Sequence, residues 1–281
     1  MLRLSYNPRV IVACEPAVPP TRAMPGTGRL RCTNVNGGTR VTRAFAVSPL
    51  KFLNPKLPGQ AAWVYTATYG GGLVDGDAID LDVEVDEGAH AVVTTQASTK
   101  VYRSTRESSQ RLHARVGRNA LLVVAPDPVV CFAGARYRQE QTFDLDASAS
   151  LVFVDWITAG RHRSGERWAF ARYASRLAIR RARHLVVYDA VVLDPADGPV
   201  DERMGRFNCL ATAVFTGPRP HRAALASPRT EGLLTSAAPL SDDGTIVKLA
   251  AESAQDAAEV LSRMIEVIHG EVGSDPWAGK W

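Results

Sequence analysis

A run of small hydrogen-bonding side chains stands out in the first half of the chain. It comprises Thr94, Thr95, Gln96, Ser98 and Thr99, and it is followed by Lys100, Tyr102 and Arg103. Hydroxyl and amide oxygens of this kind can line a polar cavity. They are also typical of a strand at a sheet edge, where hydroxyls pair between neighbouring strands. The residues alone leave both interpretations open.

Two isolated carboxylates lie in glycine-rich loops. Asp77 follows the glycines at 70–72, and it could bind a ligand or close a turn onto its own backbone. Glu166 is the lone acid of the basic loop 160–166, where it could pair with an arginine or face a channel or a partner. His162 of that loop would be a poor metal ligand, because the neighbouring arginines repel a cation.

Four further acids alternate with apolar residues: Asp80, Asp82, Glu84 and Asp86. Period-two alternation predicts a half-buried strand with these acids on one face, spaced about 6.7 Å apart. That spacing is too wide for one hard cation, whose oxygen ligands lie at about 2.1 Å. The acids therefore form either a solvated strand face or a series of weak sites along which a dication moves.

Common enzyme and metal motifs are missing from the sequence. The glycine-rich dinucleotide and phosphate loops, the nucleophile elbow, the HExxH helix and the CxxC pair do not occur, and the six histidines are isolated from one another. The four cysteines are interpreted as small core residues in a reducing cytoplasm. A hydrolase or isomerase assembled from distant strands is the weakest of the functional hypotheses.

Strand patterns dominate the elements that must position these side chains. Apolar alternation or β-branched runs recur about every ten residues, separated by Gly, Asp, Asn or Pro, and residues 36–38 predict a hairpin turn. We expect a mainly β fold, a large wound or stacked sheet sandwich resembling a β-helix. A helix is predicted over 253–269, capped by Ser253 and ended by Gly270. The start, 1–28, is expected to be irregular, and the tail 275–281 loose unless its two tryptophans hold it.

Composition sets outer limits on function. The 281 residues are 46% hydrophobic and 22% charged, which favours a single globular domain spanning 1–281. A net charge of +4 gives no argument for nucleic-acid binding. Apolar runs of about five residues cannot cross a membrane, which needs roughly 18–20. Acids cluster in 75–87 and bases in 100–118 and 161–184, which predicts opposed patches for docking partners.

Four blocks of sequence, taken together and in order, resemble a known family. They are residues 69–77, residues 94–104, residues 126–136 with their Pro-Asp-Pro start, and residues 160–170. In this order they are similar to the urease accessory protein UreD, called UreH in some lineages. The resemblance implies a non-catalytic, cytoplasmic scaffold with no tightly bound cofactor. Such a scaffold binds UreF, and through it the GTPase UreG, and docks on apo-urease while nickel(II) passes through it to the urease active site.

The resemblance also suggests which residues serve these roles. Oxygen donors that bind weakly suit transfer of nickel better than a closed Cys/His cage. Candidates for the nickel path are Asp77, Thr94, Thr95, Gln96 and Glu166. Candidates for partner binding are Gly71, Gly72, Lys100, Tyr102, Arg103, Gly160, Arg161 and Gly165. The alternative hypothesis is a pure interaction module that remodels apo-urease without conducting metal. A tunnel that runs from end to end and is lined by the named side chains would favour transfer, and a solid apolar core along that path would favour the interaction module.

Overall fold

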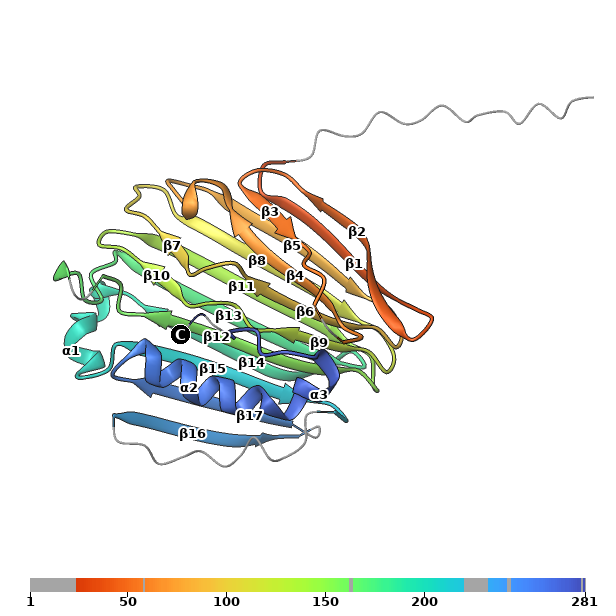
Figure 1. Ribbon diagram of the computed structural model, residues 1–281. Helices are drawn as coiled ribbons and strands as arrows, with labels where there is room; N and C mark the ends of the chain where they lie inside the picture. The colour runs from red at the N-terminus through yellow and green to blue at the C-terminus, as the bar shows by residue number, and fades with distance from the viewer. Residues whose placement is uncertain are drawn as a thin grey trace, which may run out of the picture.

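The structure is a computed structural model that describes residues 24–57, 59–161, 164–219, 232–241, 244–278 and 280. Within these residues the fold is built from two multi-stranded sheets that face one another, with a helix near the C-terminus lying on one of them (Figure 1). The predicted mainly β class is confirmed. Residues 1–23, the greater part of the predicted irregular start, lie outside the described residues. Residues 27 and 28 of that segment already belong to the first strand.

The first sheet has seven strands. In spatial order they are β14 (His184–Leu193), β13 (Arg172–Arg181), β11 (Arg136–Leu145), β8 (Ser108–Val116), β5 (Ala78–Val85), β1 (Thr27–Val35) and β2 (Gly38–Ala46). β1 and β2 form the predicted hairpin. Asn36 and Gly37 between them have φ of 53° and 83°, the left-handed values that this tight turn requires.

The second sheet has ten strands. The main path is β16 (Leu233–Leu240), β17 (Gly244–Ala251), β15 (Cys209–Thr216), β12 (Ser150–Thr158), β9 (Leu121–Val124), β6 (His90–Thr95), β4 (Ala62–Thr68) and β3 (Leu50–Leu53). Off this path, β10 (Val129–Cys131) pairs with β12 and with β7 (Thr99–Val101). Strands that follow one another in the sequence are often not neighbours in this sheet, so the short turns between strands do not all make hairpins.

The central part of the chain is wound like a β-helix. β5, β8, β11 and β13 pair in parallel in the first sheet, and β6, β9 and β12 pair in parallel in the second. The turn at residues 117–119 carries the chain from β8 in one sheet to β9 in the other. Successive windings place Asp80 beside Arg111, and Arg111 beside Glu140. The predicted wound arrangement thus follows from repeated crossing between two sheets.

The acidic strand face is paired with bases from the neighbouring windings. Asp80 forms an ion pair with Arg111, and Glu84 lies 3.7 Å from both Arg31 and Arg115. The acidic and basic segments therefore interleave on the outer face of the first sheet and do not form opposed patches there. These side chains are 45–63% exposed, so each pair contributes only about 0–1 kcal/mol to stability.

Apolar residues fill the space between the sheets in two separate clusters. β11 and β12 contribute Phe143 and Phe153 to the first cluster. The same two strands contribute Tyr137 and Ile157 to the second, so the clusters lie towards opposite ends of the strands. Both are fully enclosed, with every one of these four side chains no more than 2% exposed.

A third apolar cluster joins the outer face of the second sheet to the C-terminal helix. α2 (Ala254–Ile265) continues into η5 (Glu266–Ile268) and α3 (His269–Val272), and it buries Val260, Leu261 and Ile265 against this sheet (Figure 1). Ser253 caps α2 as predicted, since its hydroxyl accepts from the Asp256 amide at 3.1 Å. Gly270 does not end the helix. The chain turns at Gly273, which has a φ of 87°.

Among the elements in the described ranges, three short helices were not predicted. They are η1 (Tyr69–Gly71), η3 (Pro195–Asp197) and α1 (Val200–Met204). Each has five residues or fewer, which is too short for a helical period to show in the sequence.

Candidate functional site

A layer of polar side chains separates the two apolar clusters between the sheets. We call it the polar belt, and it draws on strands of both sheets. Its members are Thr66, Thr94, Thr95, Gln110, Asp127, Gln139, Asp155, Ser175, Asp189, Thr212 and Lys248. A folded core gains nothing from such a layer unless each polar group is satisfied, because burying an unpaired polar group costs about 1–3 kcal/mol. The hydrogen bonds of the belt are therefore informative.

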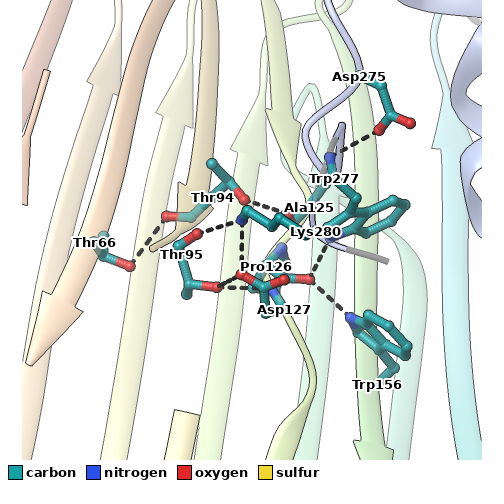
Figure 2. Close-up of polar contacts among 10 residues, drawn as sticks. All are labelled: Thr66, Thr94, Thr95, Ala125, Pro126, Asp127, Trp156, Asp275, Trp277 and Lys280. Atoms are coloured by element: carbon teal, nitrogen blue, oxygen red, sulfur yellow. Dashed lines mark hydrogen bonds and ion pairs between the residues drawn. The ribbon is translucent and has the colours of Figure 1, made fainter. Parts of the chain in front are cut away.

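At one end of the belt, Thr95 and Asp127 bond each other twice. The Thr95 hydroxyl donates to Asp127 Oδ2 at 2.9 Å and accepts from the Asp127 amide at 2.7 Å (Figure 2). The Thr94 hydroxyl donates to the Ala125 carbonyl at 2.6 Å. Both threonines are buried, which supports the cavity-lining interpretation for this pair. The Gln96 side chain is exposed, and its backbone N–H donates to the Thr66 carbonyl at 2.9 Å.

The C-terminal tail covers this end of the belt. Lys280 Nζ lies 2.7 Å from both Asp127 Oδ2 and the Thr95 carbonyl oxygen (Figure 2). The indole N–H groups of Trp156 and Trp277 donate to the Pro126 carbonyl at 2.8 and 3.0 Å. Trp277 is 2% exposed, so the first of the two tail tryptophans does hold the tail. Trp281 lies outside the described residues.

A small cavity lies behind Thr95 and Asp127. Its volume is about 60 Å³, and it is bordered by Gln110, Gln139 and Gln141 as well as the threonines. One water molecule needs about 10–15 Å³, so the cavity can hold water. Gln141 Oε1 is buried and makes no hydrogen bond within the described residues. This end of the belt therefore combines space with an unsatisfied acceptor.

Asp155 lies at the centre of the belt and joins the two sheets. Gln139 Nε2 donates to its two carboxylate oxygens at 2.8 and 2.7 Å, and the Ser175 hydroxyl donates at 2.9 Å. Burial raises the pKa of Asp155, and the hydrogen bonds from Gln139 and Ser175 oppose that rise. Burial also raises the pKa of Tyr173, whose hydroxyl lies 2.9 Å from Gln139 Nε2. The tyrosine therefore stays protonated.

A larger cavity opens on the other side of Asp155. Its volume is about 230 Å³, and its polar border comprises Asp155, Ser175, Asp189, Thr212 and Lys248. Lys248 Nζ donates to the Thr212 hydroxyl at 2.9 Å and forms an ion pair with Asp189. The belt thus runs from the cavity at Thr95 through Gln139 and Asp155 to this second cavity.

The two loop carboxylates lie outside both cavities. Asp77 Oδ2 accepts from the Val74 amide at 2.9 Å, and the Asp77 amide donates to the Val74 carbonyl at 2.8 Å, which closes a turn as one interpretation expected. Glu166 forms an ion pair with Arg161 and accepts from the Ala133 amide at 3.1 Å. The hydrogen bond from Arg161 lowers the pKa of Glu166. Neither carboxylate is brought together with Thr94 and Thr95.

The candidates for partner binding gather in loops at one end of the windings. We call residues 69–77, 100–106, 132–135, 160–161 and 164–166 the end loops. The Leu73 amide donates to the Lys100 carbonyl at 2.8 Å, and the Tyr102 ring meets the Phe132 ring at 5.0 Å. The Arg161 guanidinium lies 4.5 Å from the centroid of the same Phe132 ring. These contacts bring all four sequence blocks to one surface.

Glycine is required where the end loops pack closely. A Cβ on Gly72 would lie 2.6 Å from the Lys100 carbonyl oxygen and 2.6 Å from the Tyr102 ring. A Cβ on Gly160 would lie 2.6 Å from the Cys131 carbonyl oxygen, and its φ is 86°. Gly71 and Gly165 have φ of 74° and 79° with open space around them. Arg103 packs beside Gly134, and its side chain is exposed.

Asp127, Gln139, Asp155 and Lys280 belong to the site, although the sequence did not single them out. Asp127 stands between two prolines in a block used for the family resemblance, so only its role was missed. Asp155 is the one charged residue of the apolar stretch 151–157. A lone charge in a buried strand is a usable signal, since such residues are rarely buried without a partner. Nothing in the sequence linked Lys280 to Asp127.

Thiols and imidazoles do not supply a metal centre in the described part of the chain. Cys32, Cys131 and Cys209 are free and buried, and burial raises the pKa of each thiol. No three His, Cys, Asp or Glu side chains lie together in a way that could hold a metal ion within these residues. Cys14, His162 and His221 fall outside them.

Comparison with known proteins places this wound two-sheet fold in a family. The sequence matches the UreD urease accessory protein family over residues 24–278. It is 50% identical over 263 residues to the urease accessory protein UreD of Sorangium cellulosum, covering 91% of this chain and 84% of that protein. It is 42% identical over 264 residues to UreD of Anaeromyxobacter sp. (90% and 89% covered). It is also 42% identical over 201 residues to urease accessory protein D of Arabidopsis thaliana (69% and 68%).

The chain belongs to the UreD family of urease accessory proteins. The family resemblance seen in the sequence is thereby confirmed, and a role in support of urease is the function that this membership supports. The relatives are named as accessory proteins and not as enzymes, which is consistent with a role without catalysis. Among the described residues, no helix is long and apolar enough to cross a membrane.

Proposed function

We propose that this chain is a cytoplasmic maturation scaffold that conducts nickel(II) to urease through the polar belt. The observation that carries the proposal is the belt itself, a layer of mostly oxygen-bearing side chains that lies between two apolar clusters and borders two cavities. A dication loses water on entering a protein, and only oxygen or nitrogen donors can replace that water. The belt supplies hydroxyls, amides and single carboxylates at intervals, which bind an ion weakly enough to release it.

The path we propose starts at one cavity and ends at the other. Thr94, Thr95 and Asp127 border the small cavity, Gln139 and Asp155 form the central step, and Asp189 and Thr212 border the large cavity. Asp155 is the most important of these residues, because it is a carboxylate of the second sheet whose two donors, Gln139 and Ser175, both belong to the first sheet. Burial raises its pKa, so the ionised carboxylate stands in an environment that gains from a cation.

The end loops provide the docking surface in this proposal. They would bind UreF, with UreG held through UreF, while another face of the scaffold rests on apo-urease. Asp77 and Glu166 lie in the end loops, so we assign them to docking and not to the internal path. Gln96 is exposed beside the small cavity and would meet the ion at its entrance.

The test uses Asp155→Asn in the complete assembly with UreF, UreG and apo-urease. Asparagine keeps the shape and removes the charge. We expect the complex to co-purify in normal amounts and the nickel content of the released urease to fall several-fold. Asp80→Asn is the matched control, because Asp80 is an exposed, ion-paired carboxylate on the outer face.

The alternative function, an interaction module that remodels apo-urease, gives the opposite result. If the Asp155→Asn assembly loads urease as well as the unaltered assembly does, nickel does not need the polar belt. Loss of the complex itself would show a structural role for Asp155.

A further inference from the structure

One end of the polar belt already holds a cation, supplied by the chain itself. The ammonium of Lys280 is 2.7 Å from Asp127 Oδ2, 2.7 Å from the Thr95 carbonyl oxygen and 5.3 Å from the centroid of the Tyr65 ring. A carboxylate, a carbonyl and an aromatic face thus surround one positive charge, and Figure 2 shows the first two of these groups. These three groups come from three separate segments of the chain.

The carboxylate in this arrangement needs a cation. The Asp127 side chain is 2% exposed, and a buried carboxylate without a counter-charge is strongly destabilising. The Thr95 hydroxyl, which itself accepts from the Asp127 amide, satisfies part of the hydrogen bonding of this carboxylate, but it carries no net charge. Lys280 provides the charge, although it lies 153 positions away in sequence and on the last turn of the tail.

The same oxygens suit a metal ion as well as an ammonium. Carboxylate, carbonyl and hydroxyl oxygens are the usual ligands of divalent cations in proteins. Behind them lies the 60 Å³ cavity, with room for the water molecules that such an ion retains. Lys280 is held there by a short tail that Trp277 anchors, so the ammonium can leave while the rest of the fold stays intact.

We propose that Asp127 and Thr95 form a divalent-cation site, and that the Lys280 ammonium occupies it in competition with the metal ion. The proposal rests on the proposed function of the polar belt, and it adds a control on entry. While the tail is docked, the ammonium blocks this end of the belt. Undocking of the tail exchanges one tethered positive charge for a free dication at the same oxygens.

Binding of Ni²⁺ to the full, tag-free chain tests the proposal, with isothermal titration calorimetry as the measurement. The variant Lys280→Met keeps the length of the side chain and removes its charge. If the ammonium fills the site nine-tenths of the time, its loss raises the apparent affinity about tenfold. Asp127→Asn and the double variant Lys280→Met/Asp127→Asn should both lack this gain in affinity. Any Ni²⁺ that these two variants still bind measures binding at other surface groups.

Lys56→Met is the matched control, because Lys56 is exposed and the same substitution there removes an equal charge. A thermal melt of each variant shows whether it is folded. The proposal is overturned if Lys280→Met binds Ni²⁺ no better than the unaltered chain does. It is overturned equally if the double variant keeps the gain, because the metal would then bind elsewhere. Should Lys280→Met fail to fold, Trp277→Phe, which weakens only the anchor of the tail, must raise Ni²⁺ affinity instead.

Failure of this proposal and failure of the nickel path give different results. A gain in Ni²⁺ affinity for Lys280→Met, combined with normal urease loading by the Asp155→Asn assembly, supports the cation site and rejects the path. Unchanged affinity combined with poor loading by Asp155→Asn supports the path and rejects the tail as its control.

Discussion

The side-chain amide of Gln139 donates to both carboxylate oxygens of Asp155, at 2.8 and 2.7 Å, across the space between the two sheets. This contact joins the two cavities of the polar belt. Burial at this position favours the protonated form of Asp155, and the contact with Gln139 opposes that rise in pKa without cancelling it. The stability of the fold should therefore depend on pH in a way that can be traced to one residue.

Asp155→Asn should stabilise the protein at neutral pH and reduce nickel loading at the same time. The pKa of Asp155 is raised in the folded state, so the folded state binds the proton more tightly than the unfolded chain does. Asp155 therefore lowers stability progressively as pH rises from its unfolded pKa through its raised folded pKa. The gain in Tm from Asp155→Asn should be largest at pH 7 and shrink towards pH 4. A gain that does not vary with pH would contradict this account.

Trp277→Ala should cost about 3–5 kcal/mol of unfolding free energy, as is typical for a buried large aromatic residue. Trp277 packs against Trp156 with ring centroids 5.9 Å apart, and both indoles donate to the same carbonyl. Trp277→Phe keeps a ring in this place and loses one hydrogen bond, so it should cost less, about 1–2 kcal/mol. Urea denaturation measures both. Equal, small effects would mean that the tail contributes little to the fold.

The fold was predictable because its cause is periodic. Strands such as β5 alternate strictly between apolar and polar residues. Strand patterns recur at similar spacing along the chain, so a wound sheet could be expected. The positions of the loop carboxylates were harder to predict. Asp77 and Glu166 each contact a residue nearby in the sequence, Val74 and Arg161. Such a local contact forms whether or not the fold contains an internal path.

The membership of the polar belt depends on contacts between distant segments. Thr95 meets Asp127 across 32 positions, and Asp127 meets Lys280 across 153. No local sequence pattern indicates that such distant residues will pair. The charge clusters failed as a guide for the same reason. Winding brings Arg111 beside Asp80, so separate runs in the sequence become neighbours in the sheet.

Two glycines of the end loops should respond differently to the same substitution. Gly160 and Gly165 have φ of 86° and 79°, so alanine is strained at both, by about 1–2 kcal/mol. At Gly160 the new Cβ would also lie 2.6 Å from the Cys131 carbonyl oxygen, whereas Gly165 has open space. Gly160→Ala should therefore lower the unfolding free energy by roughly 1–3 kcal/mol more than Gly165→Ala does. Thermal or urea denaturation compares them, and equal losses would contradict the close packing.

The loop carboxylates provide a test of which surface docks partners. Asp77→Ala removes the side-chain bond that closes the turn at Val74, and Glu166→Ala frees Arg161 and the Ala133 amide. Both changes loosen the end loops and leave the polar belt untouched. We expect each variant to retain less UreF on co-purification, while the nickel delivered per assembled complex stays the same. Asp82→Ala, on the outer face of the first sheet, is the control and should change neither quantity. Normal assembly with reduced nickel delivery would instead place Asp77 and Glu166 on the ion path, as the sequence alone suggested.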